Sequence, residues 1–251
     1  MHESSMKRMQ WFKDTYLDKY KRYRILDVGS YNVNGCYKEI FNNKNIEYEG
    51  LDMVEGPNVD IVPKKAYKWN EVMDDSYECV ISGQALEHIE FFWITIGEIV
   101  RVTKEGGLIC IIAPNGFSEH RYPVDCWRFF TDGMVALAKY YQLEIVHAHT
   151  NAAPSLNDDS WYSVECADSM LIARKTYTGK AQVTDLDVYK CEPTDQNKIM
   201  GGMITYELYE KYKRNGIEEI KKKESTIRQK IKRTLKDWKF SFKNERGRKN
   251  Q

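Results

Sequence analysis

Strand-like and helix-like segments alternate along the first 175 residues, and this pattern constrains the fold more than any other feature of the chain. Short apolar runs, of which Leu108–Ala113 is the longest, are typical of buried strands. The seven expected strands cover residues 24–29, 46–53, 59–62, 77–82, 108–114, 142–149 and 167–174. Helices are expected at residues 4–23, 90–103 and 131–141, with a short one that ends at residue 41. The alternation predicts an α/β fold, a mostly parallel seven-stranded sheet with helices on both faces.

The formal net charge of +1 hides two electrostatically different parts. Residues 1–200 contain 22 basic and 30 acidic side chains, whereas residues 201–251 contain 16 basic and 7 acidic ones. Composition and periodicity together predict three parts: a domain over residues 1–175 that begins with a capping helix in residues 1–23, a linker or arm over 176–202, and a basic helical tail over 203–251. Such a charge asymmetry suggests that the tail meets an anionic partner.

The tail carries a single apolar stripe at helical spacing, formed by Ile227, Ile231, Leu235, Trp238 and Phe242. We expect first a helical arm that packs on its own domain or joins a second subunit. Attachment to an anionic membrane surface is the second reading, since the basic side chains would be attracted to the lipid headgroups. Nucleic acid is the least favoured partner, because the net charge of −8 on residues 1–200 repels phosphate backbones.

Apolar run length and cysteine spacing argue against a membrane-spanning, a disulfide-linked or a zinc-binding protein. The chain has no run of 18 apolar residues and no signal-peptide-like apolar segment near its first residue. Its six cysteines include no C-x-x-C pair, which favours reduced thiols over a disulfide framework or a zinc site. We therefore expect a cytoplasmic protein without a metal, peripheral to the inner face of the membrane if the tail binds lipid.

Three features are expected to meet at the carboxyl edge of the sheet, where open α/β sheets bind ligands. The first strand runs into a turn at Gly29 and Ser30, and glycine tolerates the backbone conformation of a tight loop near a ligand. The second strand ends in Asp52, which can accept hydrogen bonds from a ribose diol. The fourth ends at Ser82-Gly83-Gln84, where backbone carbonyls can receive an ammonium group. Together they favour a nucleoside ligand, and the missing second and third glycines of G-x-G-x-x-G disfavour NAD.

The segments RILDVGS, GLDMVEGPNVDIV, YECVISGQALEHI, EIVRVTKEGGLICIIAPN and HRYPVDCWRFFTDGM carry a resemblance to a known family. Residues 2–175 resemble class I S-adenosylmethionine (SAM) dependent methyltransferases, which have a Rossmann-like fold, and within them the type 11-like group of bacterial surface-polysaccharide and small-molecule pathways. The resemblance implies SAM as cofactor and S-adenosylhomocysteine as product. It implies that the methionine part meets Gly29 and Ser30, the ribose Asp52, the adenine Met53, and the sulfonium end Ser82 and Gln84.

Convergent polar groups follow the expected strand at 108–114, in a loop that should overhang the same edge. His120 is the candidate general base for a hydroxyl acceptor. The candidate acceptor-binding residues are Arg121, Tyr122, Asp125 and Arg128. The alternative is a structural lid with aromatic side chains in the core and solvated arginines, and we prefer that reading for the aromatic side chains only.

The other histidines offer weaker candidates. His88 is a catalytic candidate, but packing under the cofactor, with Glu87 capping the next helix, explains this pair equally well. His2 stands ahead of the first helix, and because of the resemblance it is a candidate acceptor contact and the alternative to His120 as general base. His147 and His149 alternate on one strand and are expected at the surface.

These observations predict O-methylation of a small polar, anionic acceptor: a sugar, a nucleotide-linked sugar, or a phosphate or phosphoramidate oxygen. The expected setting is bacterial capsule or surface-polysaccharide biosynthesis. Two alternatives stay open: a nucleic-acid methyltransferase or binding module that uses the basic tail, and a non-catalytic SAM-binding scaffold.

Overall fold

The computed structural model describes residues 3–116, 118–150 and 167–176. His2, the linker after residue 176 and the basic tail lie outside these ranges, so the predictions made for them remain predictions.

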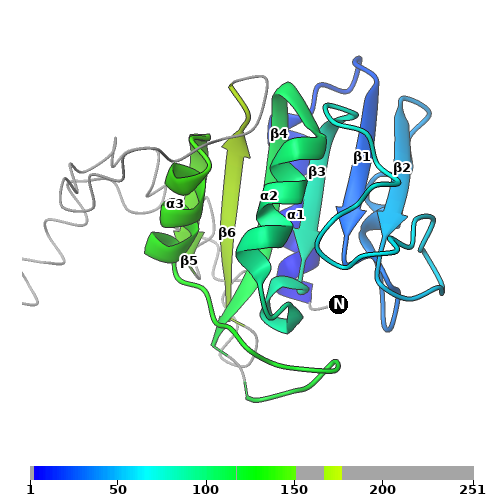
Figure 1. Cartoon of the computed structure of the whole chain (residues 1–251). Coiled ribbons are helices and arrows are strands. Elements are labelled where there is room, and N and C mark those ends of the chain that lie inside the picture. Colours follow the sequence, from blue (N-terminus) through cyan, green and yellow to red (C-terminus); the bar gives the residue numbers. More distant parts are fainter. Residues whose placement is uncertain (1–2, 117, 151–166, 177–251) are drawn as a thin grey trace, which may run out of the picture. The chain divides into compact units, whose positions relative to one another are not determined.

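The described residues form a six-stranded sheet in the order β2-β1-β3-β4-β6-β5 (Figure 1). The strands are β1 (Tyr23–Val28), β2 (Ile46–Leu51), β3 (Tyr77–Gly83), β4 (Thr103–Gly116), β5 (Glu144–Thr150) and β6 (Ala167–Arg174). The pairs β2–β1, β1–β3 and β3–β4 are parallel, whereas β6 runs antiparallel to both β4 and β5. The predicted mixed α/β class is confirmed, and the antiparallel strands lie at one side of the sheet.

Helices cover both faces of this sheet, as predicted (Figure 1). Helix α1 (Glu3–Tyr16) packs on one face, and α2 (Phe92–Val102) and α3 (Thr131–Tyr140) pack on the other. Two short 3-10 helices, η1 (Tyr37–Glu39) and η2 (Leu86–His88), follow β1 and β3. Among the described residues, no helix has both the length and the apolar character needed to cross a membrane.

Two expected elements differ from the observed ones. The first helix ends at Tyr16 rather than at residue 23, because the Asp18 side chain accepts the Tyr20 amide at 2.9 Å and forms a turn. The expected strand over 59–62 is reduced to one bridge between Ile61 and Leu51. The next residues include Pro63, which has no amide to donate, and the sheet therefore has six described strands instead of seven.

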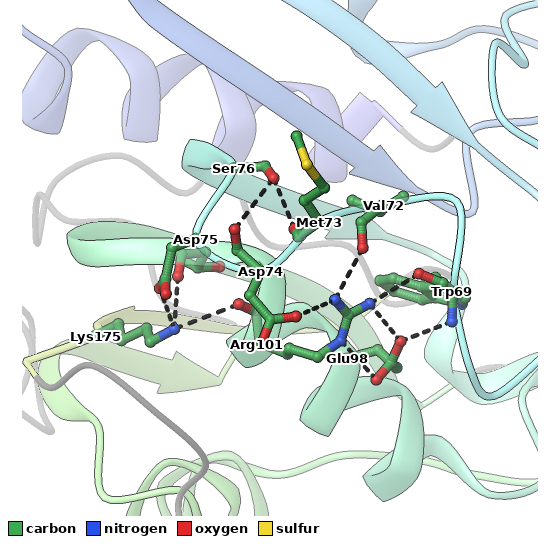
Figure 2. Close-up of polar contacts among 10 residues, drawn as sticks. Trp69, Val72, Met73, Asp74, Asp75, Ser76, Glu98, Arg101 and Lys175 are labelled. Carbon is green, nitrogen blue, oxygen red and sulfur yellow. Dashed lines mark hydrogen bonds and ion pairs between the residues drawn. The ribbon is translucent and has the colours of Figure 1, made fainter.

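Arg101 ties helix α2 to the segment that leads into β3 (Figure 2). Its guanidinium donates to the Glu98 carboxylate, to Asp74 at 2.6 Å, and to the backbone carbonyls of Trp69 and Val72. Glu98 also accepts the Trp69 amide at 2.7 Å. All five N–H donors of the arginine are therefore used on one segment of loop, which is more than a lysine ammonium could supply.

Lys175 makes a second connection beside the first (Figure 2). Its ammonium, in a side chain that is 1% exposed, donates to Asp75 at 2.7 Å and to the Thr103 carbonyl at 2.8 Å. The end of β6 is thereby fastened to the start of β4 and to the turn before β3.

We predict that Arg101→Lys lowers the free energy of unfolding by about 2 kcal/mol, because the planar five-donor network cannot be rebuilt with three donors. Urea denaturation measures the change. Arg22→Lys at an exposed position serves as the control and should stay within about 0.5 kcal/mol of the parent. Equal stability of the Arg101 variant and the parent would contradict the role assigned to the network.

Candidate functional site

The turn after β1 requires glycine at position 29 for two reasons. Gly29 has a φ of +83°, a conformation that side chains rarely adopt. A Cβ added there would come within 2.4 Å of the Ala85 Cβ, on the segment that follows β3. Its amide donates to the Leu51 carbonyl at 2.9 Å, so the turn also contacts the end of β2. The ends of three parallel strands thus meet around this one residue.

Asp52 stands directly after β2 at the same edge. One carboxylate oxygen accepts the Tyr31 amide at 3.1 Å and the other accepts the Met53 amide at 2.7 Å. The Asp52 side chain is held in place while each oxygen keeps a second lone pair. Met53 is 62% exposed, so its thioether can cover a flat apolar group.

Asp27, on β1 and two residues before Gly29, is a buried acid that sequence reasoning did not single out. Its side chain accepts a short hydrogen bond from the Tyr48 hydroxyl, and the residue is 2% exposed. Burial raises the pKa of Asp27 to about 7, although the Tyr48 hydrogen bond acts against the shift. The detectable signal was an acid inside an otherwise apolar strand segment, Ile25-Leu26-Asp27-Val28.

The two predicted serines are buried rather than open to a ligand. The Ser82 hydroxyl donates to the Val28 carbonyl at 2.8 Å and joins β3 to β1. The Ser30 hydroxyl oxygen has no hydrogen-bond partner within the described part of the chain, although the residue is only 3% exposed. Of these two positions, Ser30 is the one with unused hydrogen-bonding capacity.

Gln84 points toward a buried polar cluster on the α1 side of the sheet. Its side-chain amide donates to Asp168 at 2.8 Å, and its φ is +57°. Asp168 also accepts the Ser4 hydroxyl at 2.6 Å and lies 3.7 Å from the Arg8 guanidinium, both of them on α1. Both partners of this ion pair are fully buried. Sequence reasoning missed the cluster because β6 and α1 are far apart in the chain.

A loop after β4, residues 118–130, covers the segment that follows β3. The Cys126 amide donates to the Glu87 carbonyl at 2.7 Å, and the Phe129 amide donates to the Pro114 carbonyl at 2.9 Å. The loop therefore returns to the carboxyl end of β4, the edge at which it was expected, and it also contacts η2.

Asp125 organises the interior of this loop. Its carboxylate accepts two hydrogen bonds from Arg128, at 2.5 and 2.8 Å, and the His120 amide at 2.8 Å. The Arg128 hydrogen bonds hold the pKa of Asp125 well below its usual range. Asp125 and Arg128 thus form an internal ion pair that positions His120.

Arg121 and Tyr122 lie on the outside of the same loop. The Arg121 side chain is 74% exposed and pairs with Glu119 at 2.7 Å, and Tyr122 is 66% exposed. An exposed ion pair of this kind contributes little to stability, so the guanidinium can change partners at small cost.

His88 and His120 come together from two separate segments. Their ring centroids lie 4.9 Å apart. Nδ1 of His88 lies 2.6 Å from the Val124 carbonyl, and Nδ1 of His120 lies 3.0 Å from the Ser118 carbonyl. A carbonyl can only accept, so in each of these two contacts Nδ1 is the donor.

Glu87 is buried beside this pair, and it does not cap α2. The residue is 0% exposed, and neither carboxylate oxygen has a hydrogen-bond partner among the described residues. Oε1 lies 3.7 Å from Nε2 of His88. Burial raises the pKa of Glu87 to about 8, against smaller opposing effects of its own backbone amide and of Arg128.

His147 and His149 are buried, which makes the surface prediction for them wrong. They are 4% and 5% exposed, and the Nε2 atom of His147 lies 2.6 Å from Nδ1 of His149. The Trp11 ring of α1 packs on His147 with centroids 4.9 Å apart. Helix α1 covers this side of β5, which a strand read in isolation does not reveal.

The predicted residues fall into two neighbouring groups in the structure. Gly29, Asp52 and Met53 form one group at the ends of β1 and β2. The second group comprises His88, His120, Asp125 and Arg128. The contact between Gly29 and Ala85 joins the two groups, because Ala85 directly precedes η2.

Comparison with known proteins gives a match over part of the chain. Residues 18–111 match a family model described as a methyltransferase domain. No curated protein sequence matches the chain.

Solved structures share the fold at low sequence identity. A Burkholderia thailandensis 1,6-didemethyltoxoflavin-N1-methyltransferase, solved with 1,6-didemethyltoxoflavin and S-adenosylhomocysteine, is 14% identical with a TM-score of 0.53, covering 70% of this chain and 80% of its own. The Haloferax volcanii methyltransferase in complex with the Trm112 activator is 15% identical with a TM-score of 0.51. The match covers 71% of this chain and 91% of the Haloferax chain. The YcgJ protein from Bacillus subtilis is 16% identical with a TM-score of 0.50. The match covers 70% of this chain and 100% of YcgJ.

We predict that Asp27→Asn removes a pH-dependent loss of stability. With a folded pKa near 7 and an ordinary unfolded pKa, Asp27 is protonated in the folded state but ionised in the unfolded state between about pH 4 and 7. The contribution of Asp27 to stability therefore falls as pH rises through this window, by at most about 1.4 kcal/mol for each pH unit.

Urea denaturation at a series of pH values tests this prediction. The stability of Asp27→Asn minus that of the parent should increase from pH 4 to 7 and level off above, whereas Glu55→Gln at an exposed position should show no such trend. A difference that stays constant over the window would contradict the shifted pKa.

Proposed function

We propose that this chain, a SAM-dependent methyltransferase by its domain and its Rossmann-like fold, methylates a hydroxyl oxygen of a small polar, anionic acceptor. The acceptor class is a sugar, a nucleotide-linked sugar, or a molecule with a phosphate or phosphoramidate oxygen. The corresponding setting is bacterial capsule or surface-polysaccharide biosynthesis.

The first group of residues fits the cofactor. Gly29 leaves room where a side chain would clash, Asp52 presents carboxylate lone pairs for a ribose diol, and exposed Met53 can pack on the adenine. The unpartnered Ser30 hydroxyl is a further candidate contact. Ser82 and Gln84 would contribute through their backbone, since their side chains bond to Val28 and Asp168. SAM supplies a methyl group that is bound to a positively charged sulfur. When the methyl group is transferred, the sulfur keeps the electron pair of the broken S–C bond.

The observation that carries the hydroxyl acceptor is the histidine pair beside this group. A hydroxyl oxygen that forms a new bond to carbon must lose its proton, and a nearby imidazole can take it. His88 and His120 each place Nδ1 on a backbone carbonyl, so Nε2 is the ring nitrogen that would take the proton. The Asp125 contacts keep His120 in place, so Asp125 acts as a positioning residue.

An anionic acceptor is supported by the outer side of the loop. Arg121 is exposed and bound only weakly to exposed Glu119, so its guanidinium can turn to a phosphoryl group. Tyr122 offers an exposed hydroxyl next to it. Arg128, in contrast, is committed to Asp125 and would act on the acceptor through the position of the loop.

We predict that the purified chain binds SAM and S-adenosylhomocysteine and that Asp52→Ala weakens both at least tenfold, because two charge-assisted hydrogen bonds to the ribose are lost. Isothermal titration calorimetry measures the affinities. Glu55→Gln, an exposed substitution on the same loop, is the control and should bind as the parent does. A parent chain that binds neither ligand would refute the cofactor assignment.

We also predict methylation of phosphorylated acceptors in a panel assayed with labelled SAM, and a KM that rises about tenfold in Arg121→Ala with little change in kcat. Arg22→Ala, a distant exposed arginine, should leave both constants unchanged. Labelled polynucleotide instead of small molecules would favour the nucleic-acid alternative. SAM binding without any methylated product would favour the non-catalytic scaffold.

A further inference from the structure

Three side chains of metal-binding type converge on one point of the site. One ligand atom each of Glu87, His88 and His120 lies within 4.8 Å of the other two. Glu87 and His88 come from η2, and His120 comes from the loop after β4. The two segments are joined by the Cys126 amide on the Glu87 carbonyl, so the convergence is built into the backbone.

The buried Glu87 side chain offers unused oxygen lone pairs to a cation. Burying a carboxylate without hydrogen bonds is expensive, and such groups are paired or bind metals. Glu87 is fully buried, and neither of its oxygens has a hydrogen-bond partner in the described part of the protein. The neighbouring arginines form ion pairs with other carboxylates: Arg128 donates to Asp125, and Arg8 pairs with Asp168.

The two imidazoles have the hydrogen bonds that orient metal ligands. A metal-binding histidine commonly donates its second ring N–H to a carbonyl or a carboxylate, which fixes the tautomer and aims the other nitrogen at the ion. His88 does so to Val124, at 2.6 Å, and His120 does so to Ser118, at 3.0 Å. Nε2 of His88 is the ring atom paired with Glu87, at 3.7 Å.

We propose that Glu87, His88 and His120 bind a divalent first-row transition-metal ion, which in turn binds an oxygen of the methyl acceptor. Two imidazoles and one carboxylate suit ions such as Mn²⁺, Fe²⁺, Co²⁺ and Zn²⁺. Three protein ligands leave coordination positions open for water or an acceptor hydroxyl. In the loaded site the imidazole lone pairs bind the ion, which would replace a free imidazole by lowering the pKa of the acceptor hydroxyl. This role rests on the proposed function, whereas the metal site itself does not.

Loading of the site draws the ligands together. Ligand atoms at ~2.1 Å from one ion lie roughly 3 Å from each other, which is closer than in the structure. His120 is the ligand best able to move, because its side chain is 26% exposed and it lies on a loop, whereas Glu87 is enclosed. Metal binding would thus bring the loop toward η2, at the place where the acceptor is expected.

The test measures metal directly on the full chain. After chelation and dialysis, the parent protein is titrated with Co²⁺, and bound metal is followed by visible absorption, by elemental analysis and by competition with Zn²⁺. We expect one equivalent per chain, with binding weakened at least tenfold in Glu87→Gln and in His120→Ala. Glu119→Gln is the matched control: it changes an exposed acid on the same loop and should bind Co²⁺ as the parent does.

Two results would overturn the proposal. The first is a parent chain that takes up no stoichiometric Co²⁺ or Zn²⁺. The second is equal uptake by the parent and by both ligand variants. Circular dichroism shows whether each variant folds, and His120→Ala, on the exposed loop, keeps the test valid if Glu87→Gln unfolds.

A SAM titration on the same samples separates this proposal from the proposed function. Failure of metal binding with intact SAM binding removes the metal site alone. Absence of SAM binding removes the cofactor assignment, whatever the metal result.

Discussion

Parallel pairing of β1 with β2 and with β3 is the constraint on which the site depends. Because the strands run the same way, Val28, Leu51 and Gly83 end at one edge, and the segments that follow them must turn within a small space. The close approach of Gly29 to Ala85 is a direct result, and a side chain at position 29 would push these segments apart. The group of Gly29, Asp52 and Met53 and the group around His88 and His120 are neighbours for the same reason.

The sequence predicted the layout of this edge but not its interior. Periodicity placed the strands and helices, since buried strands and amphipathic helices leave a direct trace in the order of residues. The positions of Gly29 and Asp52 could be predicted because each directly follows a strand in the sequence. The prediction of a strand over residues 59–62 was wrong, because the pairing of this segment is limited to a single bridge at Ile61. Pairing depends on tertiary contacts that the local sequence does not show.

Buried polar groups were the least predictable part. His147 and His149 were expected in solvent because alternation along a strand gives the face of a residue but not what covers that face. The Asp168 cluster joins residues more than 160 positions apart, so no local pattern marks it. Glu87 illustrates the same limit: its place before His88 suggested a helix cap, whereas its isolation from hydrogen-bond partners is visible only in three dimensions.

The Asp168 cluster also connects helix α1 with the ligand edge. Ser4 and Arg8 hold the helix to Asp168, and the same carboxylate accepts the side-chain amide of Gln84 at the end of β3. Any ligand that favours one orientation of Gln84 therefore changes the free energy with which α1 docks, and by thermodynamic reciprocity a well-docked α1 raises the affinity for that ligand. Under the proposed function, the docking of the first helix is therefore thermodynamically coupled to cofactor binding at this edge.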